Sequence, residues 1–211
     1  MEPGDQVSTP YHVRPRKRPV MEGIRPMQHE LVRRAQEGDH EAFGALVHGA
    51  IARLFASARL ILRDPDLAED AVQDALVEAW RDLRGLRDPD RLDAWLHRLL
   101  VRSCYRAAKR ERRRHIIEIP LAFDHDTPIP DGLEGVGVRD QLERAFARLP
   151  ADHRTILVLA YYADLSLADV SVALGIPVGT TKSRLSRASN ALRAALAADE
   201  RAATLSTGRI A

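Results

Sequence analysis

Apolar side chains recur every three or four residues along most of the chain, which is the period of an α-helix with one buried face. Between residues 30 and 114 the period is carried by Leu31, Ala35, Ala42, Leu46, Val47, Leu54, Ala58, Ile61 and Leu62. It returns over residues 139–198, where we expect helices at 140–149, 152–163, 166–174 and 178–197. The fold class is therefore predicted to be all-α, with two small helical domains.

Local signals divide the first helical region. Residues 64–66 (DPD) predict a helix start, because an acceptor side chain, a proline in the first turn and an acid near the helix N-terminus all favour one. The helix that begins there should run to about Trp80. Gly85 and residues 88–90 (DPD) then predict a break, and a further helix is expected over residues 91–113.

The N-terminal segment is unsuited to regular structure. Residues 1–26 contain five prolines and few apolar side chains, so we predict a disordered basic tail over residues 1–27. The cluster at 16–18 (RKR) fits a solvated leader better than a contact with DNA. Met21 and Met27 remain alternative start sites to Met1.

A second atypical segment lies between the helical regions. Residues 115–137 contain three prolines, three glycines and five acidic residues, with no lysine or arginine. A stretch of this length without helical period is uncommon inside a compact domain, so it predicts a flexible acidic linker. The predicted organisation is a tail at 1–27, a domain at 28–114, a linker at 115–138, a domain at 139–198 and a C-terminal tail at 199–211.

Composition narrows the class of protein. The 211 residues include 45% hydrophobic but only 5% aromatic side chains, and the formal net charge is +2. A single cysteine, Cys104, excludes an internal disulfide and a cysteine-based metal site. We find no catalytic motif, cofactor-binding motif or secretion signal, and no apolar run near the roughly 20 residues that span a bilayer. We therefore expect a cytoplasmic protein that is not an enzyme, needs no cofactor and does not insert into a membrane.

Residues 166–187 carry the strongest local signal. A short helix capped by Ser166 should end at Gly175, which lacks a Cβ and can adopt a left-handed conformation. The next helix follows Pro177 and has no acidic residue from 178 to 198. Its first turns offer short hydrogen-bonding side chains and cations that can reach base edges in the major groove. This pattern predicts a DNA-binding helix-turn-helix rather than a helical hairpin with a solvated basic face.

The first domain shows opposite charges on successive helices. Asp70, Gln73, Asp74 and Val77 fall on one side of the helix after Pro65, while a buried side is expected from Ala71, Ala75, Leu76 and Ala79. The exposed stripe is acidic and suits a basic protein surface. The helix over 91–113 is strongly basic, which suits phosphate contacts. These features describe a protein that bridges a protein partner and DNA.

Two motifs carry a resemblance to a known family. Residues 68–75 (AEDAVQDA), 79–80 (AW) and 94–98 (AWLHR) resemble region 2 of the sigma-70 family of RNA polymerase sigma factors. Residues 149–150 (LP), 166–175 and 179–188 (GTTKSRLSRA) resemble region 4. With only these two regions and a short linker, the chain is similar to the extracytoplasmic-function (ECF) subfamily over about residues 28–198.

The resemblance implies three binding surfaces and three partners. The partners would be core RNA polymerase (through its β′ clamp and β flap), promoter DNA and, left open, an anti-sigma factor. The surface for the β′ clamp would comprise Asp70, Gln73, Asp74 and Val77. The surface that reads and opens the −10 element would comprise Gly85, Leu86, Arg87, Arg91, Arg98, Arg102, Arg106, Lys109 and Arg110. The surface that reads the −35 element would comprise Val178, Gly179, Thr180, Thr181, Lys182, Ser183, Arg184 and Arg187.

Some positions depart from the family pattern. Ser171 and Thr181 stand where alanine and valine are usual, and Val101 with Arg102 replaces a common Arg-Asn pair, which leaves the preferred −10 sequence open. The alternative function is a free-standing helix-turn-helix regulator that never joins polymerase, and the acidic stripe argues against it.

Overall fold

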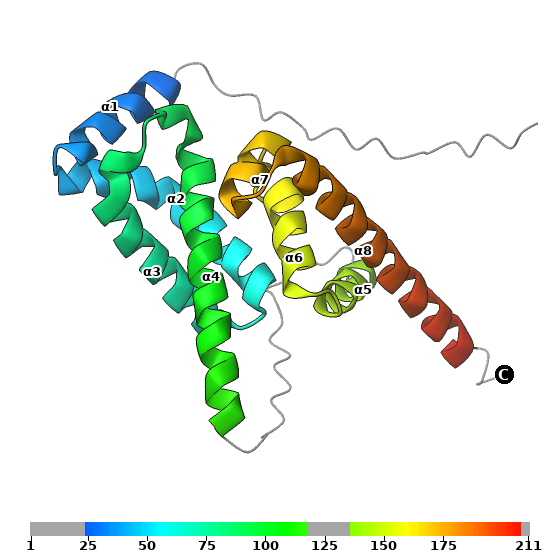
Figure 1. Ribbon diagram of the computed structural model, residues 1–211. Helices are drawn as coiled ribbons and strands as arrows, with labels where there is room; N and C mark the ends of the chain where they lie inside the picture. The colour runs from blue at the N-terminus through cyan, green and yellow to red at the C-terminus, as the bar shows by residue number, and fades with distance from the viewer. Residues whose placement is uncertain (1–23, 118–135, 208–211) are drawn as a thin grey trace, which may run out of the picture.

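The computed structural model describes residues 24–117 and 136–207, and the regular elements in these ranges are all helical (Figure 1). The first part of the chain forms α1 (Ile24–Gln36), α2 (His40–Leu62), α3 (Pro65–Asp82) and α4 (Leu92–Ile117). Two short 3-10 turns, η1 (Leu83–Gly85) and η2 (Pro89–Arg91), join α3 to α4. The basic cluster at 16–18 and most of the acidic linker lie outside the described residues.

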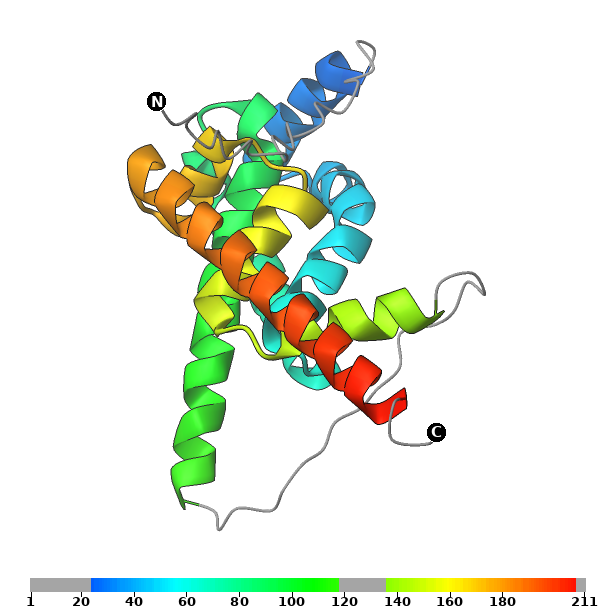
Figure 2. The ribbon, with the colours of Figure 1, turned by 90° about the vertical axis from the view of Figure 1, so that its right-hand side faces the viewer.

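The second part of the chain forms four helices and a π-helical turn. They are α5 (Val136–Ala147), α6 (Ala151–Leu157), the π-helix η3 (Val158–Tyr162), α7 (Leu167–Leu174) and α8 (Val178–Thr207). Figure 2 shows α8 crossing α5 and α6 along its length, and the same pairs of helices are in contact. The predicted all-α class with two helical domains is confirmed.

The N-terminal helix begins earlier than the sequence pattern suggested. α1 starts at Ile24 and includes Pro26, so the prediction of a tail through residue 27 is wrong for its last four residues. A proline is compatible with the first turn of a helix because the backbone N–H that it lacks has no intrahelical acceptor there. Counting prolines over residues 1–26 does not separate Pro26, in the first turn of α1, from prolines that would break a helix interior.

A break between α1 and α2 was also not predicted. Gly38 has φ +101°, a backbone conformation that residues with a Cβ rarely adopt. Asp39 then caps α2, because its Oδ1 accepts hydrogen bonds from the backbone N–H groups of Glu41 and Ala42 at 2.9 and 3.0 Å. The turn reverses the chain and brings α1 alongside α2.

The core of the first domain forms where α2, α3 and α4 pack together. The expected buried side of α3 is confirmed for Ala71, Ala75 and Ala79, which are at most 2% exposed. These small side chains let α3 lie close to its neighbours. Larger side chains fill the remaining space, and Leu54, Leu83 and Leu100 are fully buried. Trp80 packs in the same domain, with its ring stacked on His40 at 4.3 Å between centroids.

α2 has a property that the sequence pattern did not predict. By length and composition alone, this 23-residue helix could cross a membrane, because an 18-residue stretch of it has a mean hydropathy of 1.5. In the structure the helix packs against α1, α3, α4 and α6 and buries Leu54, Ala58 and Ile61. These contacts identify α2 as the central core helix of the domain.

The C-terminal helix is longer than predicted. α8 continues to Thr207, ten residues beyond the expected end, so the prediction of a tail from residue 199 is wrong for most of that segment. Asp199 is only 8% exposed and forms an ion pair with Arg148, the residue after α5, and its other oxygen lies 4.0 Å from the guanidinium of Arg144 in α5. This pairing holds α8 to α5 beyond the last predicted turn.

The two domains pack against each other. α7 contacts α4, and α6 and η3 contact α2. The Arg154 guanidinium donates hydrogen bonds to the carbonyl oxygens of Ile61 in α2 (3.0 Å) and Leu149 (2.6 Å). The Tyr105 hydroxyl on α4 donates to Asp152 Oδ1 on α6 at 2.8 Å. The free chain therefore forms one body in which the second domain docks on the first.

The Tyr105 contact predicts a dependence of domain docking on alkaline pH. Tyr105 is 40% exposed, and its partial burial, with a smaller contribution from Asp152, raises its pKa to about 12, against about 10 for a free tyrosine. Because the neutral phenol is favoured in the docked state, its contribution is complete below about pH 10 and is lost between about pH 10 and 12. The phenolate absorbance of the chain minus that of Tyr105→Phe should therefore titrate near 12. A midpoint near 10 would contradict the docked arrangement.

Candidate docking and nucleic-acid surfaces

The predicted docking stripe lies on the solvent side of α3. Asp64 caps this helix, with its Oδ1 accepting from the N–H groups of Asp66 and Leu67 at 2.9 Å each. Asp70, Gln73 and Val77 are exposed, and Asp74 is half-buried. Val77 is 49% exposed and adds an apolar surface beside the polar side chains. The stripe thus combines two carboxylates, an amide and an apolar contact point.

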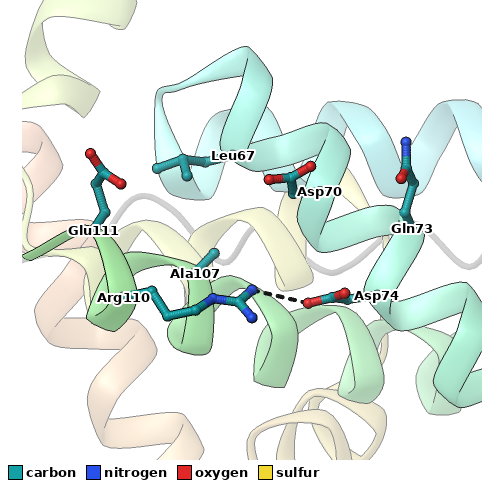
Figure 3. A pocket seen from close by; sticks show the side chains of 7 residues that line it. All are labelled: Leu67, Asp70, Gln73, Asp74, Ala107, Arg110 and Glu111. Atoms are coloured by element: carbon teal, nitrogen blue, oxygen red, sulfur yellow. Dashed lines mark hydrogen bonds and ion pairs between the residues drawn. The ribbon is translucent and has the colours of Figure 1, made fainter. Parts of the chain in front are cut away.

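A polar groove separates this stripe from α4. The groove has a volume of about 310 Å³ and is lined by Leu67, Asp70, Gln73, Asp74, Ala107, Arg110 and Glu111 (Figure 3). Arg110 reaches across it from α4, with its Nη2 3.0 Å from Asp74 Oδ2. One helical turn away, Arg106 forms an ion pair with Glu78. The sequence pattern predicted the acidic and basic surfaces separately but did not predict that they pair with each other.

Most of the predicted −10 side chains are accessible. Arg98 is half-buried, and the exposed members of this set are Gly85, Arg87, Arg91, Arg102, Arg106, Lys109 and Arg110. Leu86 is only 6% exposed and packs in the core. Its assignment to a DNA-contacting surface is corrected, since an apolar side chain in the core of the domain has no free atoms to offer to a base.

The loop that carries part of this surface is held in place by α1. The Gln36 amide donates to the carbonyl oxygens of Leu83 (3.0 Å) and Leu86 (2.9 Å), and the Gln28 amide donates to Pro89 O at 2.6 Å. Side-chain amides can replace the missing backbone partners of an irregular loop. Sequence reasoning missed Gln28 and Gln36, because nothing in the local pattern indicates that α1 lies beside residues 83–90.

Two side chains of α4 that could carry chemistry, Cys104 and His97, are buried. Cys104 is 2% exposed, and burial raises the pKa of its thiol to about 12. His97 is also 2% exposed, and burial lowers its pKa, so that the neutral ring is favoured. A thiol that resists ionisation is a poor nucleophile. Neither side chain offers a catalytic group to the surface.

The predicted helix-turn-helix is present in α7 and α8. Ser166 Oγ accepts from the backbone N–H of Asp169 at 3.1 Å and so caps α7. At the other end, Gly175 has φ +66°; its N–H donates to Val172 O, and the N–H of Ile176 donates to Ser171 O. This pair of hydrogen bonds is a Schellman motif, which ends a helix and turns the chain sharply. Gly175 therefore fixes the angle at which α8 leaves α7.

The first turns of α8 present most of the predicted −35 residues to solvent. Val178, Gly179, Lys182, Ser183 and Arg187 are exposed, and Thr180 and Arg184 are half-buried. Thr181 is fully buried, and its Oγ1 donates to Pro177 O at 3.1 Å. The placement of Thr181 among the DNA-contacting side chains is corrected. Its hydroxyl is satisfied by the carbonyl oxygen of Pro177, the residue that precedes α8.

Comparison with known proteins identifies the class. Residues 43–114 match the family described as "Sigma-70 region 2", and residues 139–192 match "Sigma-70, region 4". The ECF RNA polymerase sigma factor SigM of Mycobacterium tuberculosis is 34% identical over 160 residues, covering 75% of this chain and 79% of SigM. The RNA polymerase sigma-H factor of Pseudomonas aeruginosa is 30% identical over 178 residues, covering 79% of this chain and 92% of that protein.

Solved structures give the same result for the fold. The sigma factor RpoE, in complex with the anti-sigma factor NepR from Bartonella quintana, matches with a TM-score of 0.62 and 30% identity over 74% of this chain and 98% of that one. CnrH in complex with the cytosolic domain of CnrY matches with a TM-score of 0.58 and 27% identity, covering 82% of this chain and 99% of that chain.

The fold and surfaces define a two-domain helical transcription factor with a helix-turn-helix in its second domain. Matches to both sigma-70 regions cover most of the described chain, and relatives above 30% identity span most of its length. The chain belongs to the sigma-70 family, as an ECF RNA polymerase sigma factor.

Proposed function

We propose that this sigma factor joins core RNA polymerase through the α3 stripe and recognises promoter DNA through two separate surfaces. The stripe of Asp70, Gln73, Asp74 and Val77 would meet the β′ clamp. The −10 surface would be formed by the exposed residues of the 85–91 loop and the arginines and Lys109 along α4. The −35 surface would be formed by the exposed residues in the first turns of α8.

This assignment rests on one observation: acidic and apolar side chains lie on one surface of the folded chain, and hydrogen-bonding and cationic side chains lie on others. The stripe on α3 carries two carboxylates and an apolar side chain but no cation, and it therefore suits a protein partner rather than DNA. The side chains at the start of α8, which include the exposed Lys182 and the half-buried Thr180 and Arg184, combine hydrogen-bonding groups with cations, as readers of the major groove do. The free-standing regulator is the less favoured alternative, since it gives the α3 stripe no partner.

The proposal extends to the setting and the mode of action. Acting with polymerase and DNA, the chain would work in the cytoplasm and by binding alone, without a catalytic centre of its own. The sigma factor RpoE, of similar structure, was solved in complex with the anti-sigma factor NepR, and CnrH was solved in complex with the cytosolic domain of CnrY. A regulator of that kind is therefore proposed for this chain as well.

Site-specific photocrosslinking tests the assignment of the surfaces. A photoreactive amino acid at Gln73 is expected to label the β′ subunit in the reconstituted holoenzyme, and one at Thr180 is expected to label DNA upstream of the start site in the promoter complex. Ala194, exposed on α8 four turns beyond Thr180, serves as the control position and should label neither. Labelling of DNA from Gln73, or of no partner from either site, would overturn the assignment.

A further inference from the structure

Arg110 and Asp74 belong to different proposed surfaces, and yet they form an ion pair in the free chain. Asp74 lies in the stripe proposed for polymerase, and Arg110 lies in the surface proposed for −10 DNA; their side-chain atoms are 3.0 Å apart. Arg106 and Glu78 pair in the same way one turn along both helices. The two pairs form a ladder that closes the acidic side of α3 against the basic side of α4.

The Arg110 guanidinium sits at the place where a basic side chain of a protein partner would be received. It lies in a groove whose apolar floor comes from Leu67 and Ala107 and whose carboxylates include Asp70 and Asp74 (Figure 3). Such a groove accommodates the aliphatic stem of an arginine or lysine and pairs with its charge. Arg110 fills this role from within the molecule.

We infer that Arg110 is an internal competitor for the docking groove, so that polymerase binding releases Arg110 toward DNA. The inference rests on the proposed docking surface and adds a regulation to it. When a cation of the polymerase pairs with Asp74, the Arg110 side chain loses its partner and its charge becomes available to a phosphate of the promoter. By linkage, a DNA phosphate that takes Arg110 also frees Asp74 for polymerase.

The exposure of the pair makes the exchange feasible. The Arg110 and Asp74 side chains are 56% and 44% exposed, so the pair is hydrated and screened rather than locked in the core. Exposed ion pairs of this kind contribute about 0.2–1 kcal/mol, which corresponds to about 1.4- to 5-fold in an equilibrium constant. A partner that offers several contacts can displace such a pair. The coupling is therefore modest but has a definite sign.

The test is the affinity of the full chain for core polymerase at low ionic strength. Arg110→Gln removes the competitor and is expected to bind core polymerase about 2- to 5-fold more tightly than the unsubstituted chain. Arg112→Gln is the matched control: it removes the same charge from the same helix, at an exposed position with no ion pair in the described part of the chain. This control should change the affinity by less than about 1.5-fold, the effect of net charge alone.

A double-mutant cycle sharpens the result. In a chain that already carries Asp74→Asn, the further change Arg110→Gln should give no gain beyond that of Arg112→Gln, because the groove no longer holds the carboxylate for which Arg110 competes. In the chain that keeps Asp74, equal effects of Arg110→Gln and Arg112→Gln on polymerase affinity would overturn the inference while leaving the docking proposal intact. Failure of the unsubstituted chain to bind core polymerase would overturn both.

A second measurement examines the exchange without polymerase. Asp74→Asn should release Arg110 and raise the affinity of the free chain for a single-stranded DNA oligonucleotide at low salt by about 2-fold more than Asp66→Asn does. Asp66 is an exposed acid on the same helix and controls for the loss of one negative charge. An equal response of the two variants would contradict the release of Arg110.

Discussion

A chain that carries both Asp70→Ala and Asp74→Ala is expected to lose about 100-fold or more of its affinity for core polymerase. Each substitution removes a carboxylate from the proposed docking stripe on α3, and a hydrogen bond to a charged group contributes about 1.5–3 kcal/mol when its partner is desolvated. The loss of two such hydrogen bonds lowers the affinity by more than the small increase that is expected when Arg110 no longer competes for the groove. The affinity is measured by titrating fluorescently labelled chain with core polymerase.

The folded state should survive these two substitutions. Asp70 is exposed and Asp74 is half-buried, and alanine favours the helical conformation of α3. A matched control is the double variant Glu41→Ala and Asp82→Ala, which removes two exposed acids from outside the stripe. The control is expected to bind as the unsubstituted chain does. Unchanged polymerase binding by the Asp70 and Asp74 variant would show that docking uses another surface.

The largest effect on stability is expected from Leu100→Ala. Leu100 lies on α4 with no exposed surface, in the core shared with α2 and α3. Removing its side chain loses the transfer free energy of the buried atoms and leaves a cavity, which together lower the free energy of unfolding by about 2–5 kcal/mol. Urea denaturation followed by circular dichroism at 222 nm measures this change.

Leu142→Ala is the appropriate comparison for the core substitution. The Leu142 side chain on α5 is 46% exposed, so its truncation should change the free energy of unfolding by less than about 0.5 kcal/mol. A loss below about 1 kcal/mol for Leu100→Ala would contradict the packing of α4 against its neighbours.

The features that could be predicted from sequence are those set by local chemistry. The helix-turn-helix was predicted because Ser166 and Gly175 each act on their own segment, as a cap and as a left-handed residue. The same is true of the start of α3, where Asp64 accepts hydrogen bonds within two or three residues. The stripe on α3 follows from helical spacing alone. In each case the cause and the effect lie within one turn of helix.

The features that were missed depend on contacts between distant segments. Gln36 holds the loop at Leu83 and Leu86, and Arg110 pairs with Asp74, across 36 to 50 positions of the chain. No periodic pattern reports which helices become neighbours. Thr181 was misassigned for a related reason: its polarity suggested a surface position, but its hydroxyl donates to the carbonyl oxygen of Pro177 just before α8 and the side chain is buried.

In-vitro transcription by purified core polymerase on a library of genomic fragments, with and without this chain, tests most directly whether it acts as a sigma factor through α3. We expect new start sites with shared upstream sequences, which appear only when the chain is present. These sites should disappear with the Asp70→Ala and Asp74→Ala variant and persist with the Glu41→Ala and Asp82→Ala control. Transcription that is unchanged by the chain, or start sites that are indifferent to Asp70 and Asp74, would contradict a sigma factor that docks through α3.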